Sequence, residues 1–324
     1  MDRISASGKV ILFGEHSVVY GHPALAMGIG GALVAESVTP APRRLTVEVS
    51  DWGLAASDSD PGIVGEALRR IAAAVPGSAG CRLVARARIP AAAGLGSSAA
   101  LAVLAARALS GCRDAGLDDE GVRAAAHQAE CVFHGRPSGL DDAVATHGGL
   151  CLFRRSEWTA DDRLPVPARP LAPGLLRVAG RVPPLVVGQT GVARSTAVLV
   201  AAVRARRERD PAAVDALFAA IGRSLDDGLR ALASGERAPL GAAMSGCQAS
   251  LDALGLSCAE IDRMIAIARD HGALGAKLTG GGGGGSVIAV ASPGGEQAIL
   301  GAWAAEGFAG RVVNGVEGDA GVPQ

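Results

Sequence analysis

The feature that most constrains this chain is a run of six glycines, residues 280–285, within the stretch KLTGGGGGGS. Gly-rich runs are typical of flexible linkers between domains. Here, however, the apolar stretch GALGAKLT leads into the run and the strand-like SVIAV follows it directly. Because both flanks are expected to be ordered, the run is too short to separate two domains. We therefore expect a positioned backbone inside one compact unit, close to a ligand.

Composition and charge narrow the class of protein. The chain has 324 residues, 49% of them hydrophobic, which suffices for the core of one large or two medium domains. Its 31 basic and 32 acidic residues nearly balance, so neither nucleic acid nor an anionic membrane is expected as a partner. The six cysteines lack CxxC spacing, and neither a signal peptide nor a membrane span is recognisable. We expect a reduced, soluble, cytoplasmic protein.

The hydrophobic pattern predicts strands before helices. Short apolar or alternating runs predict strands at 9–13, 44–50, 82–89, 184–188 and 286–290. Helical patterns occupy 97–111, 118–135, 195–209, 211–234 and 257–272. In the last of these helices, Ser257 and Glu260 predict a capping box. Without a regular βαβ alternation, this order indicates an α+β fold, and the Pro-rich segment 165–184, predicted to be irregular, is the candidate domain boundary.

The loop PAAAGLGSS at residues 90–98 predicts a phosphate site. Small residues from Ala91 to Gly96 allow a backbone to approach a ligand closely, and the loop leads into a helix N-terminus, which favours an anion. One of the two serines would cap the helix and the other would reach a metal ion or a phosphate oxygen. The loop is neither a Walker A motif nor a Rossmann fingerprint, and an ordinary capped helix after a turn explains the same pattern.

A second polar group surrounds the first predicted strand. Lys9 precedes this strand, and Glu15 and His16 follow it, so a cation and an acid–imidazole pair are expected at its two ends. A solvated lysine and a turn histidine are the alternative interpretation.

A third group lies in HQAECVFHGRPSGLDD, residues 127–142. His127, Glu130 and His134 share one helix face, but i to i+7 spans roughly 10 Å, too far for one zinc ion. Glu130 alone suits Mg²⁺, together with a hydroxyl and nucleotide phosphates. Asp141, in a Pro/Gly loop after the helix, is placed like a catalytic carboxylate, whereas Asp142 is interpreted as solvated or capping.

Taken together, these segments resemble the GHMP kinase superfamily and, within it, the mevalonate kinases. The resemblance covers nearly the whole chain in order: GKVILFGEHSVVYGHPALA, PAAAGLGSSAA, HGRPSGLD, TGVARST and KLTGGGGGGS. It implies a two-domain α+β fold, with a ribosomal S5 domain 2-like N-terminal domain (1–180), a ferredoxin-like C-terminal domain (181–324) and the active site in the cleft between them. A homodimer is also implied.

The implied activity is ATP- and Mg²⁺-dependent phosphorylation of the 5-hydroxyl of (R)-mevalonate in isoprenoid biosynthesis. Asp141 would be the general base or orient the hydroxyl, and Lys9 would favour the alkoxide and offset charge on the γ-phosphate. Ser98 and Glu130 would hold Mg²⁺. The implied ATP-phosphate loop consists of Ala92, Ala93, Gly94, Leu95, Gly96, Ser97 and Ser98. The implied substrate-binding residues are Glu15, His16, Arg194, Thr196 and Gly280, and the six glycines would pack beside the phosphate loop.

Some residues depart from the family pattern. Gly281 stands where the family usually has Ala, Ser286 where it often has Cys, and Gln189 where an acid or Asn is common. Arg194 replaces a small residue, and its guanidinium would bind the substrate carboxylate or shift the preference to a phosphorylated substrate. The activities of a phosphomevalonate kinase, a mevalonate 3-kinase or a homoserine kinase therefore remain alternatives for this chain. A non-catalytic ATP-binding sensor would be expected to lack Lys9, Glu130 or Asp141, and all three are present.

Overall fold

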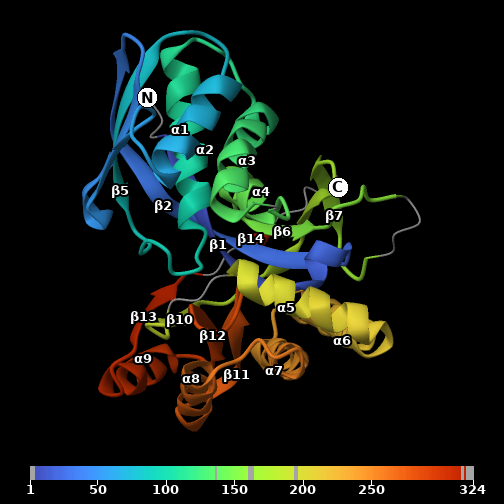
Figure 1. Ribbon diagram of the computed structural model, residues 1–324. Coiled ribbons are helices and arrows are strands. Elements are labelled where there is room, and N and C mark those ends of the chain that lie inside the picture. The colour runs from blue at the N-terminus through green and yellow to red at the C-terminus, as the bar shows by residue number, and fades with distance from the viewer. Residues whose placement is uncertain (1–3, 136, 160–163, 193–195, 315–316, 319–324) are drawn as a thin grey trace. The chain divides into compact units, whose positions relative to one another are not determined.

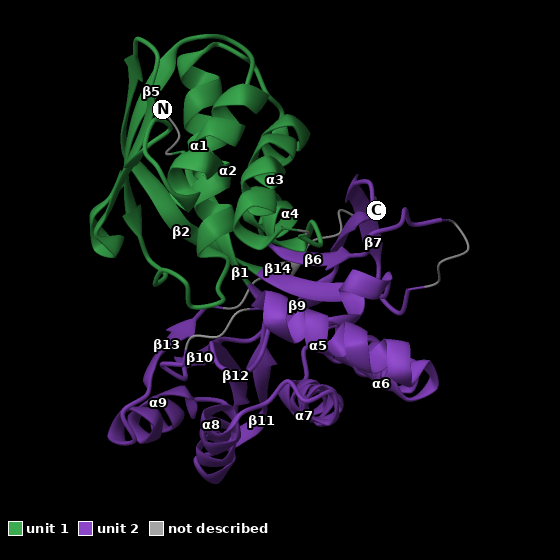
Figure 2. Ribbon diagram, viewed as in Figure 1, with its two compact units in different colours: residues 1–9, 28–148 green, residues 10–27, 149–324 purple. Residues whose placement is uncertain are grey.

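The computed structural model describes residues 4–135, 137–159, 164–192, 196–314 and 317–318 (Figure 1). Two compact units divide the chain (Figure 2): one comprises residues 1–9 and 28–148, the other residues 10–27 and 149–324. The border between them falls inside strands β1 (Ser5–Phe13) and β2 (Ala24–Ala41), which therefore contribute to both units. The domain boundary predicted at residue 180 stays a prediction.

The first unit contains a mixed sheet in the order β4-β3-β5-β2. Its further strands are β3 (Leu45–Val49), β4 (Leu54–Ser57) and β5 (Gly80–Ala87). Strand β3 runs parallel to β5, and the other pairs are antiparallel. In β5 the predicted alternation is confirmed, since Leu83 and Ala85 are buried whereas Arg82 and Arg86 are exposed.

Helices cover one face of this sheet (Figure 1) and form the core with it. They are α1 (Ile63–Ala74), α2 (Ser97–Cys112), α3 (Asp119–His134) and the short α4 (Leu140–His147). Helix α2 is buried along nearly its whole length, and its alanines let α3 pack closely against it. Helix α3 has the predicted limits, because Asp118 caps it by accepting from the Gly121 N–H at 2.8 Å and Gly135 ends it.

The second unit begins with strands that pair with the start of β2. They are β6 (Leu150–Phe153), β7 (Ala168–Ala172) and β8 (Leu175–Val178), in the order β2-β6-β8-β7, and β9 (Gly180–Arg181) pairs with β14 (Glu317–Gly318). Three of these strands lie in 165–184, so the prediction of an irregular segment is wrong. Prolines are tolerated there because Pro170 lies in β7, at the edge of the sheet, where an N–H donor can be dispensed with.

A second, antiparallel sheet in this unit has the order β11-β12-β10-β13. Its strands are β10 (Leu185–Gln189), β11 (Ala273–Thr279), β12 (Ser286–Ala291) and β13 (Ala309–Val313). The six glycines join β11 to β12 as a hairpin with Thr279 opposite Ser286, so the prediction that they lie within a compact unit is confirmed. At Gly284, with φ 142°, a Cβ atom would come within 2.4 Å of the Val192 carbonyl oxygen, so only glycine fits.

The remaining helices belong to the second unit: α5 (Thr196–Arg209), α6 (Pro211–Ser234), α7 (Arg237–Ala253), α8 (Ala259–Asp270) and α9 (Glu296–Ala305). Helices α8 and α9 pack on the second sheet. The predicted capping box of α8 is wrong, because the helix begins one residue later, at N-cap Cys258, and the Ser257 hydroxyl bonds to the Asp262 carboxylate instead. Within the part of the chain that is described, no helix is long and apolar enough to cross a membrane.

Candidate active site

Lys9 and Asp141 form an ion pair in the first unit. The sequence had predicted that Lys9 precedes the first strand. In the structure Lys9 lies within β1, and its side chain is buried. Its Nζ atom is 3.2 Å from Oδ1 of Asp141, whose side chain is 27% exposed. Asp141 lies in the first turn of α4 rather than in a loop, because the helix already begins at Leu140. A cation and a partly accessible carboxylate therefore meet at a helix N-terminus, where negative charge is favoured.

The predicted phosphate loop packs directly on Lys9. The Lys9 N–H donates to the Leu95 carbonyl oxygen at 2.8 Å. Gly96 has φ 75°, and a Cβ atom there would come within 2.8 Å of Cγ of Lys9. The loop closes on itself through the Ser97 hydroxyl, which accepts from the Ala92 N–H at 3.0 Å. Glycine at position 96 thus allows the close approach of loop and lysine stem.

The N-terminus of α2 follows this loop without a side-chain cap. The predicted serine cap is therefore wrong, because the Ser97 hydroxyl serves the loop instead. An α-helix carries partial positive charge and unsatisfied N–H groups at this end. The loop residues Ala92 to Ser98 and this helix end are accordingly suited to a phosphate group.

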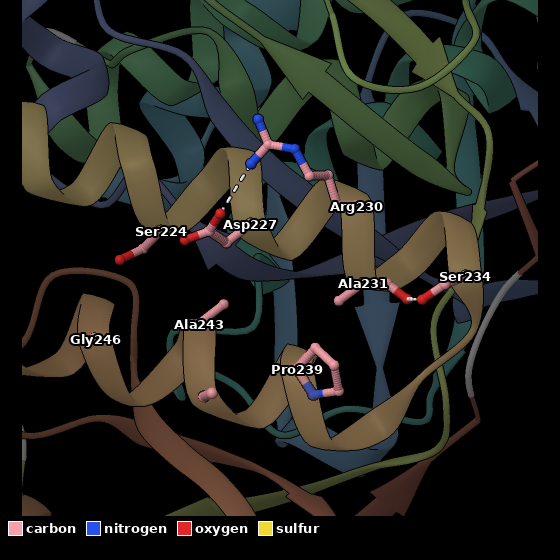
Figure 3. A pocket seen from close by; sticks show the side chains of 9 residues that line it. Ser224, Asp227, Arg230, Ala231, Ser234, Pro239, Ala243 and Gly246 are labelled. Atoms are coloured by element: carbon pink, nitrogen blue, oxygen red, sulfur yellow. Dashed lines mark hydrogen bonds and ion pairs between the residues drawn. The ribbon is translucent and has the colours of Figure 1, made fainter.

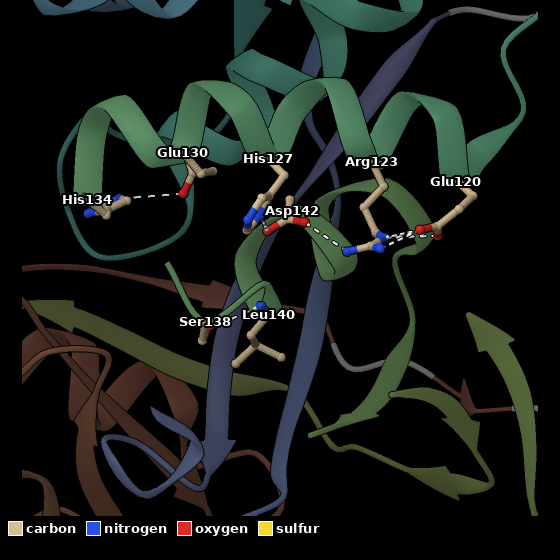
Figure 4. Close-up of polar contacts among 8 residues, drawn as sticks. All are labelled: Glu120, Arg123, His127, Glu130, His134, Ser138, Leu140 and Asp142. Carbon is tan, nitrogen blue, oxygen red and sulfur yellow. Dashed lines mark hydrogen bonds and ion pairs between the residues drawn. The ribbon is translucent and has the colours of Figure 1, made fainter. Parts of the chain in front are cut away.

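Glu130, on α3, is buried beside the same loop's last serine. Neither of its carboxylate oxygens has a hydrogen-bond partner among the described residues. Burial, and secondarily the charge of Asp141, raise the pKa of Glu130 to about 8. The Nε2 atom of His134 lies 3.5 Å from Oε2 of Glu130 (Figure 4). The same atom lies 3.4 Å from the Ser98 hydroxyl oxygen. A buried carboxylate near a serine hydroxyl fits a hard cation such as Mg²⁺.

Among the described residues, Glu130 is not part of a larger cluster of metal-binding side chains. Over the residues that the structure describes, no three His, Cys, Asp or Glu side chains are grouped so as to hold a metal ion. Mg²⁺ is usually held by one or two carboxylates with water and substrate phosphates, so the surroundings of Glu130 fit this ion.

Asp142 joins helices α3 and α4. Its side chain is fully buried, with Oδ2 3.3 Å from Nη1 of Arg123 and Oδ1 3.3 Å from Nδ1 of His127 (Figure 4). The interpretation of Asp142 as solvated is therefore wrong, because in a helix that begins at Leu140 this position faces α3. Arg123 also bonds to Glu120 at 2.9 Å, which leaves its guanidinium with carboxylates on both helices. This cluster fixes the two helices that carry the carboxylates described above.

In the second unit, Glu15 and His16 are held by the glycine-rich hairpin. The Nζ atom of Lys277 donates to Oε1 of Glu15, and both side chains are fully buried. Nε2 of His16 lies 2.9 Å from the Gly281 carbonyl oxygen. Burial lowers the pKa of His16, and its hydrogen bond to Gly281 opposes this shift. The sequence predicted Glu15 and His16 as site residues but did not single out Lys277.

Side chains also fix the strand that precedes Glu15. The Thr279 hydroxyl accepts from the Ile11 N–H and donates to the Ile11 carbonyl oxygen, each at 3.0 Å. Next to it, Oε1 of Gln248 accepts from the Leu278 N–H at 2.9 Å. The last part of β1 is therefore fastened to β11.

The other predicted substrate-binding residues lie near the same hairpin or outside the described residues. Gly280 is buried and follows β11 directly. A Cβ atom at Gly281 would come within 2.5 Å of the Thr196 hydroxyl, so Thr196 lies against the glycines at the start of α5. Arg194 falls in 193–195, outside the described residues.

A depression elsewhere in the second unit lies between α6 and α7 (Figure 3). Small residues such as Ala231, Ala243 and Gly246 line much of it. Its charged side chains, Asp227 and Arg230, form an exposed ion pair of 2.9 Å. Of the predicted site residues that the structure describes, none lines this depression.

Comparisons with known proteins agree with the arrangement of motifs. The model of the GHMP kinases N-terminal domain matches residues 62–149, and that of the GHMP kinases C-terminal domain matches residues 229–309. The chain is 34% identical to the mevalonate kinase of Thermococcus gammatolerans over 314 residues, which cover 89% of this chain and 88% of that protein. It is 33% identical to the mevalonate kinase of Pyrococcus abyssi, covering 91% and 90%.

A solved structure shares the fold. The crystal structure of L. major mevalonate kinase in complex with R-mevalonate superposes with a TM-score of 0.77 at 28% identity, over 99% of this chain and 97% of that one. The predicted two-domain α+β fold is confirmed.

Proposed function

The chain belongs to the GHMP kinase family, and from this premise we propose that it transfers the γ-phosphoryl group of ATP to the 5-hydroxyl of (R)-mevalonate, giving 5-phosphomevalonate for isoprenoid biosynthesis. The observation that carries the proposal is the Lys9–Asp141 pair beside an uncapped helix N-terminus, in a chain that resembles mevalonate kinases over about nine tenths of its length.

The first unit would supply the phosphoryl-transfer chemistry. The loop from Ala92 to Ser98 and the N-terminus of α2 would bind the ATP phosphates through backbone N–H groups. The acceptor oxygen would attack the γ-phosphorus as the bond to the bridging oxygen of ADP breaks, and Asp141 would take the hydroxyl proton late in this step. Lys9 would offset the negative charge on the transferred group.

Ser98 and Glu130 would hold Mg²⁺, and their surroundings fit this ion as described above. When bound, Mg²⁺ would neutralise part of the phosphate charge. Glu130 would then serve as the buried carboxylate ligand, with the Ser98 hydroxyl as the neutral one.

The second unit would bind the acceptor. Glu15, His16, Thr196 and Gly280 gather at the glycine-rich hairpin, and a neutral His16 can both donate and accept a hydrogen bond. Arg194 would bind the carboxylate of mevalonate. The same guanidinium suits a phosphate group, which is why phosphomevalonate must be compared directly as an acceptor.

The proposal is tested by ADP release from purified protein with Mg-ATP. Parallel reactions would receive (R)-mevalonate, 5-phosphomevalonate, homoserine, galactose or no acceptor, with the product analysed by ³¹P NMR. We expect turnover with mevalonate and phosphorylation at the 5-position. Phosphorylation at the 3-position, or turnover confined to another acceptor, would refute the assignment. ATP binding without any turnover would instead indicate a sensor.

The cellular compartment and the assembly of the protein are also proposed. All six cysteines are free, which supports a reducing compartment such as the cytoplasm. The homodimer and the family domains 1–180 and 181–324 are proposed from the resemblance. Light scattering after size exclusion would measure the first, and separate expression of the two segments would test the second.

A further inference from the structure

Lysine is scarce in this chain and confined to two sites. Of the 31 basic residues only Lys9 and Lys277 are lysines, and the rest are arginines. Both lysines are buried, and each pairs with a carboxylate, that of Asp141 or that of Glu15. The exposed ion pairs, such as Arg204–Glu208, use arginine.

This distribution sets Lys277 apart. On a solvated surface arginine and lysine are often interchangeable, but in a closed site a compact ammonium and a planar guanidinium are not. A chain that otherwise uses arginine throughout thus keeps lysine at the position that has been given a catalytic role, and at one other. The second position therefore points to a requirement for an ammonium group.

We propose that Lys277 is a positioning residue for the acceptor, which holds the Glu15 carboxylate as a fixed hydrogen-bond acceptor for a hydroxyl group of the bound alcohol. This proposal rests on the proposed function and adds to it the residue on which Glu15 depends. Lys277 itself is fully buried and does not need to touch the substrate.

The contacts of Lys277 fit this role. Besides Oε1 of Glu15, its Nζ atom donates to the Leu278 carbonyl oxygen at 2.6 Å, so two of its three N–H groups have defined directions. The strand that carries Lys277 is fixed by the two hydrogen bonds between the Thr279 hydroxyl and the backbone of Ile11. The ammonium thus has two defined partners, and one of them is the Glu15 carboxylate.

Stability alone does not account for this pair. Removing two charges from water costs about as much as their attraction returns, so a buried ion pair is seldom better than apolar packing of the same volume. Glu15 and Lys277 are nevertheless both fully buried. A carboxylate that must keep one orientation at a binding site provides the reason for this arrangement.

The first experiment compares steady-state kinetics of variants. In Lys277→Met we expect kcat/KM for (R)-mevalonate to fall about 10²-fold, the size of effect that a misplaced binding group produces. The KM for ATP should stay within about threefold of the wild-type value, because the residues proposed to bind the nucleotide lie on other elements. Lys277→Arg should show a similar loss, since a guanidinium does not fit the closed site.

A double variant separates positioning from independent effects. If Lys277 acts through Glu15, then Glu15→Gln combined with Lys277→Met should be no slower than Glu15→Gln alone. The matched control is Gln248→Met, which removes the neighbouring bond to Leu278 without touching Glu15. This control should lower Tm and leave the KM for mevalonate unchanged. Multiplying losses in the double variant, or a normal KM for mevalonate in Lys277→Met, would overturn the proposal.

The second experiment makes its decisive measurement on the wild-type chain and uses one variant only to assign a signal. Protein labelled with [¹³Cε]lysine should give two lysine signals, and Glu15→Gln should identify that of Lys277 by moving it. Adding (R)-mevalonate without nucleotide should shift this signal, whereas bound mevalonate with an unmoved signal would contradict the proposal. If wild-type protein instead turns over a different acceptor, the proposed function fails, and the same titration with that acceptor still decides the role of Lys277.

Discussion

At the scale of single residues, the side chain whose loss should affect chemistry most selectively is Asp141. Asp141→Asn keeps the shape of the side chain but removes the proton acceptor beside Lys9. We expect kcat to fall by about 10² to 10⁴, the usual range for a lost general base, with ATP affinity nearly unchanged. Turnover assays and calorimetric titration with a non-hydrolysable ATP analogue would measure both. Asp227→Asn, at an exposed site, is the control, and near-normal turnover of Asp141→Asn would refute the assigned role.

His16 gives a prediction on pH. Its pKa is lowered in the folded protein, so below about pH 6.5 the unfolded chain binds a proton that the folded chain does not. The stability contributed by the neutral ring is therefore present above that pH and lost as the pH falls through it. In urea unfolding at pH 8, 7, 6 and 5, the free energy of unfolding should fall less steeply with decreasing pH for His16→Asn than for wild type. Asparagine is chosen because it tolerates the φ of 59° at this position.

Parallel curves for the two proteins would show that His16 does not titrate differently in the folded and unfolded states. The comparison isolates this residue because the other histidines are common to both proteins.

At the scale of elements, the buried Asp142 makes helices α3 and α4 dependent on one carboxylate. Asp142→Asn would leave Arg123 with Glu120 as its remaining charged partner and weaken the contact to His127. We expect the free energy of unfolding to fall by about 1–3 kcal/mol, as when a buried hydrogen bond to a charged group is lost. Asp118→Asn, at the N-cap of α3, is a matched control, because Asn caps an N-terminus as well as Asp. Equal urea midpoints for the two variants would contradict this account.

Elements with clear local signals could be predicted from the sequence. Helix α6 runs over the predicted 211–234, because Asp210 caps it, Pro211 opens it and Gly235 ends it. The long strand β2 and helix α1 were missed. In β2, residues 24–41, glycines and alanines blur the alternation that marks a strand, and the pairing partners that stabilise it lie far along the chain.

The site was predicted where its motifs are local and missed where partners meet across the sequence. Asp141, Glu130 and the phosphate loop could be predicted because they lie in short local motifs marked by glycines and helix ends. Lys277 lies 262 residues from Glu15, and no local pattern pairs them. The available signal was compositional: a lysine is unusual in a chain that otherwise relies on arginine.

At the scale of the whole molecule, the proposed roles divide between the two compact units. Hydrogen exchange should therefore respond to each ligand in a different part of the chain. Mg-ATP should slow exchange mainly in residues 92–99, which comprise the phosphate loop and the start of α2. Mevalonate without nucleotide should slow it mainly in residues 14–17 and 277–286. Protection by mevalonate confined to residues 28–148 would contradict the assignment of acceptor binding to the glycine-rich hairpin.

The burial of both lysines also limits what can be attached to the folded protein. Neither ε-amino group is available at the surface, since Lys9 and Lys277 are at most 5% exposed. Acetyl transfer, ubiquitin conjugation and amine-reactive dyes all require an accessible lysine amine. The native chain should therefore resist acylation and isopeptide tagging at its lysines, and reaction at either one would report that the fold had opened.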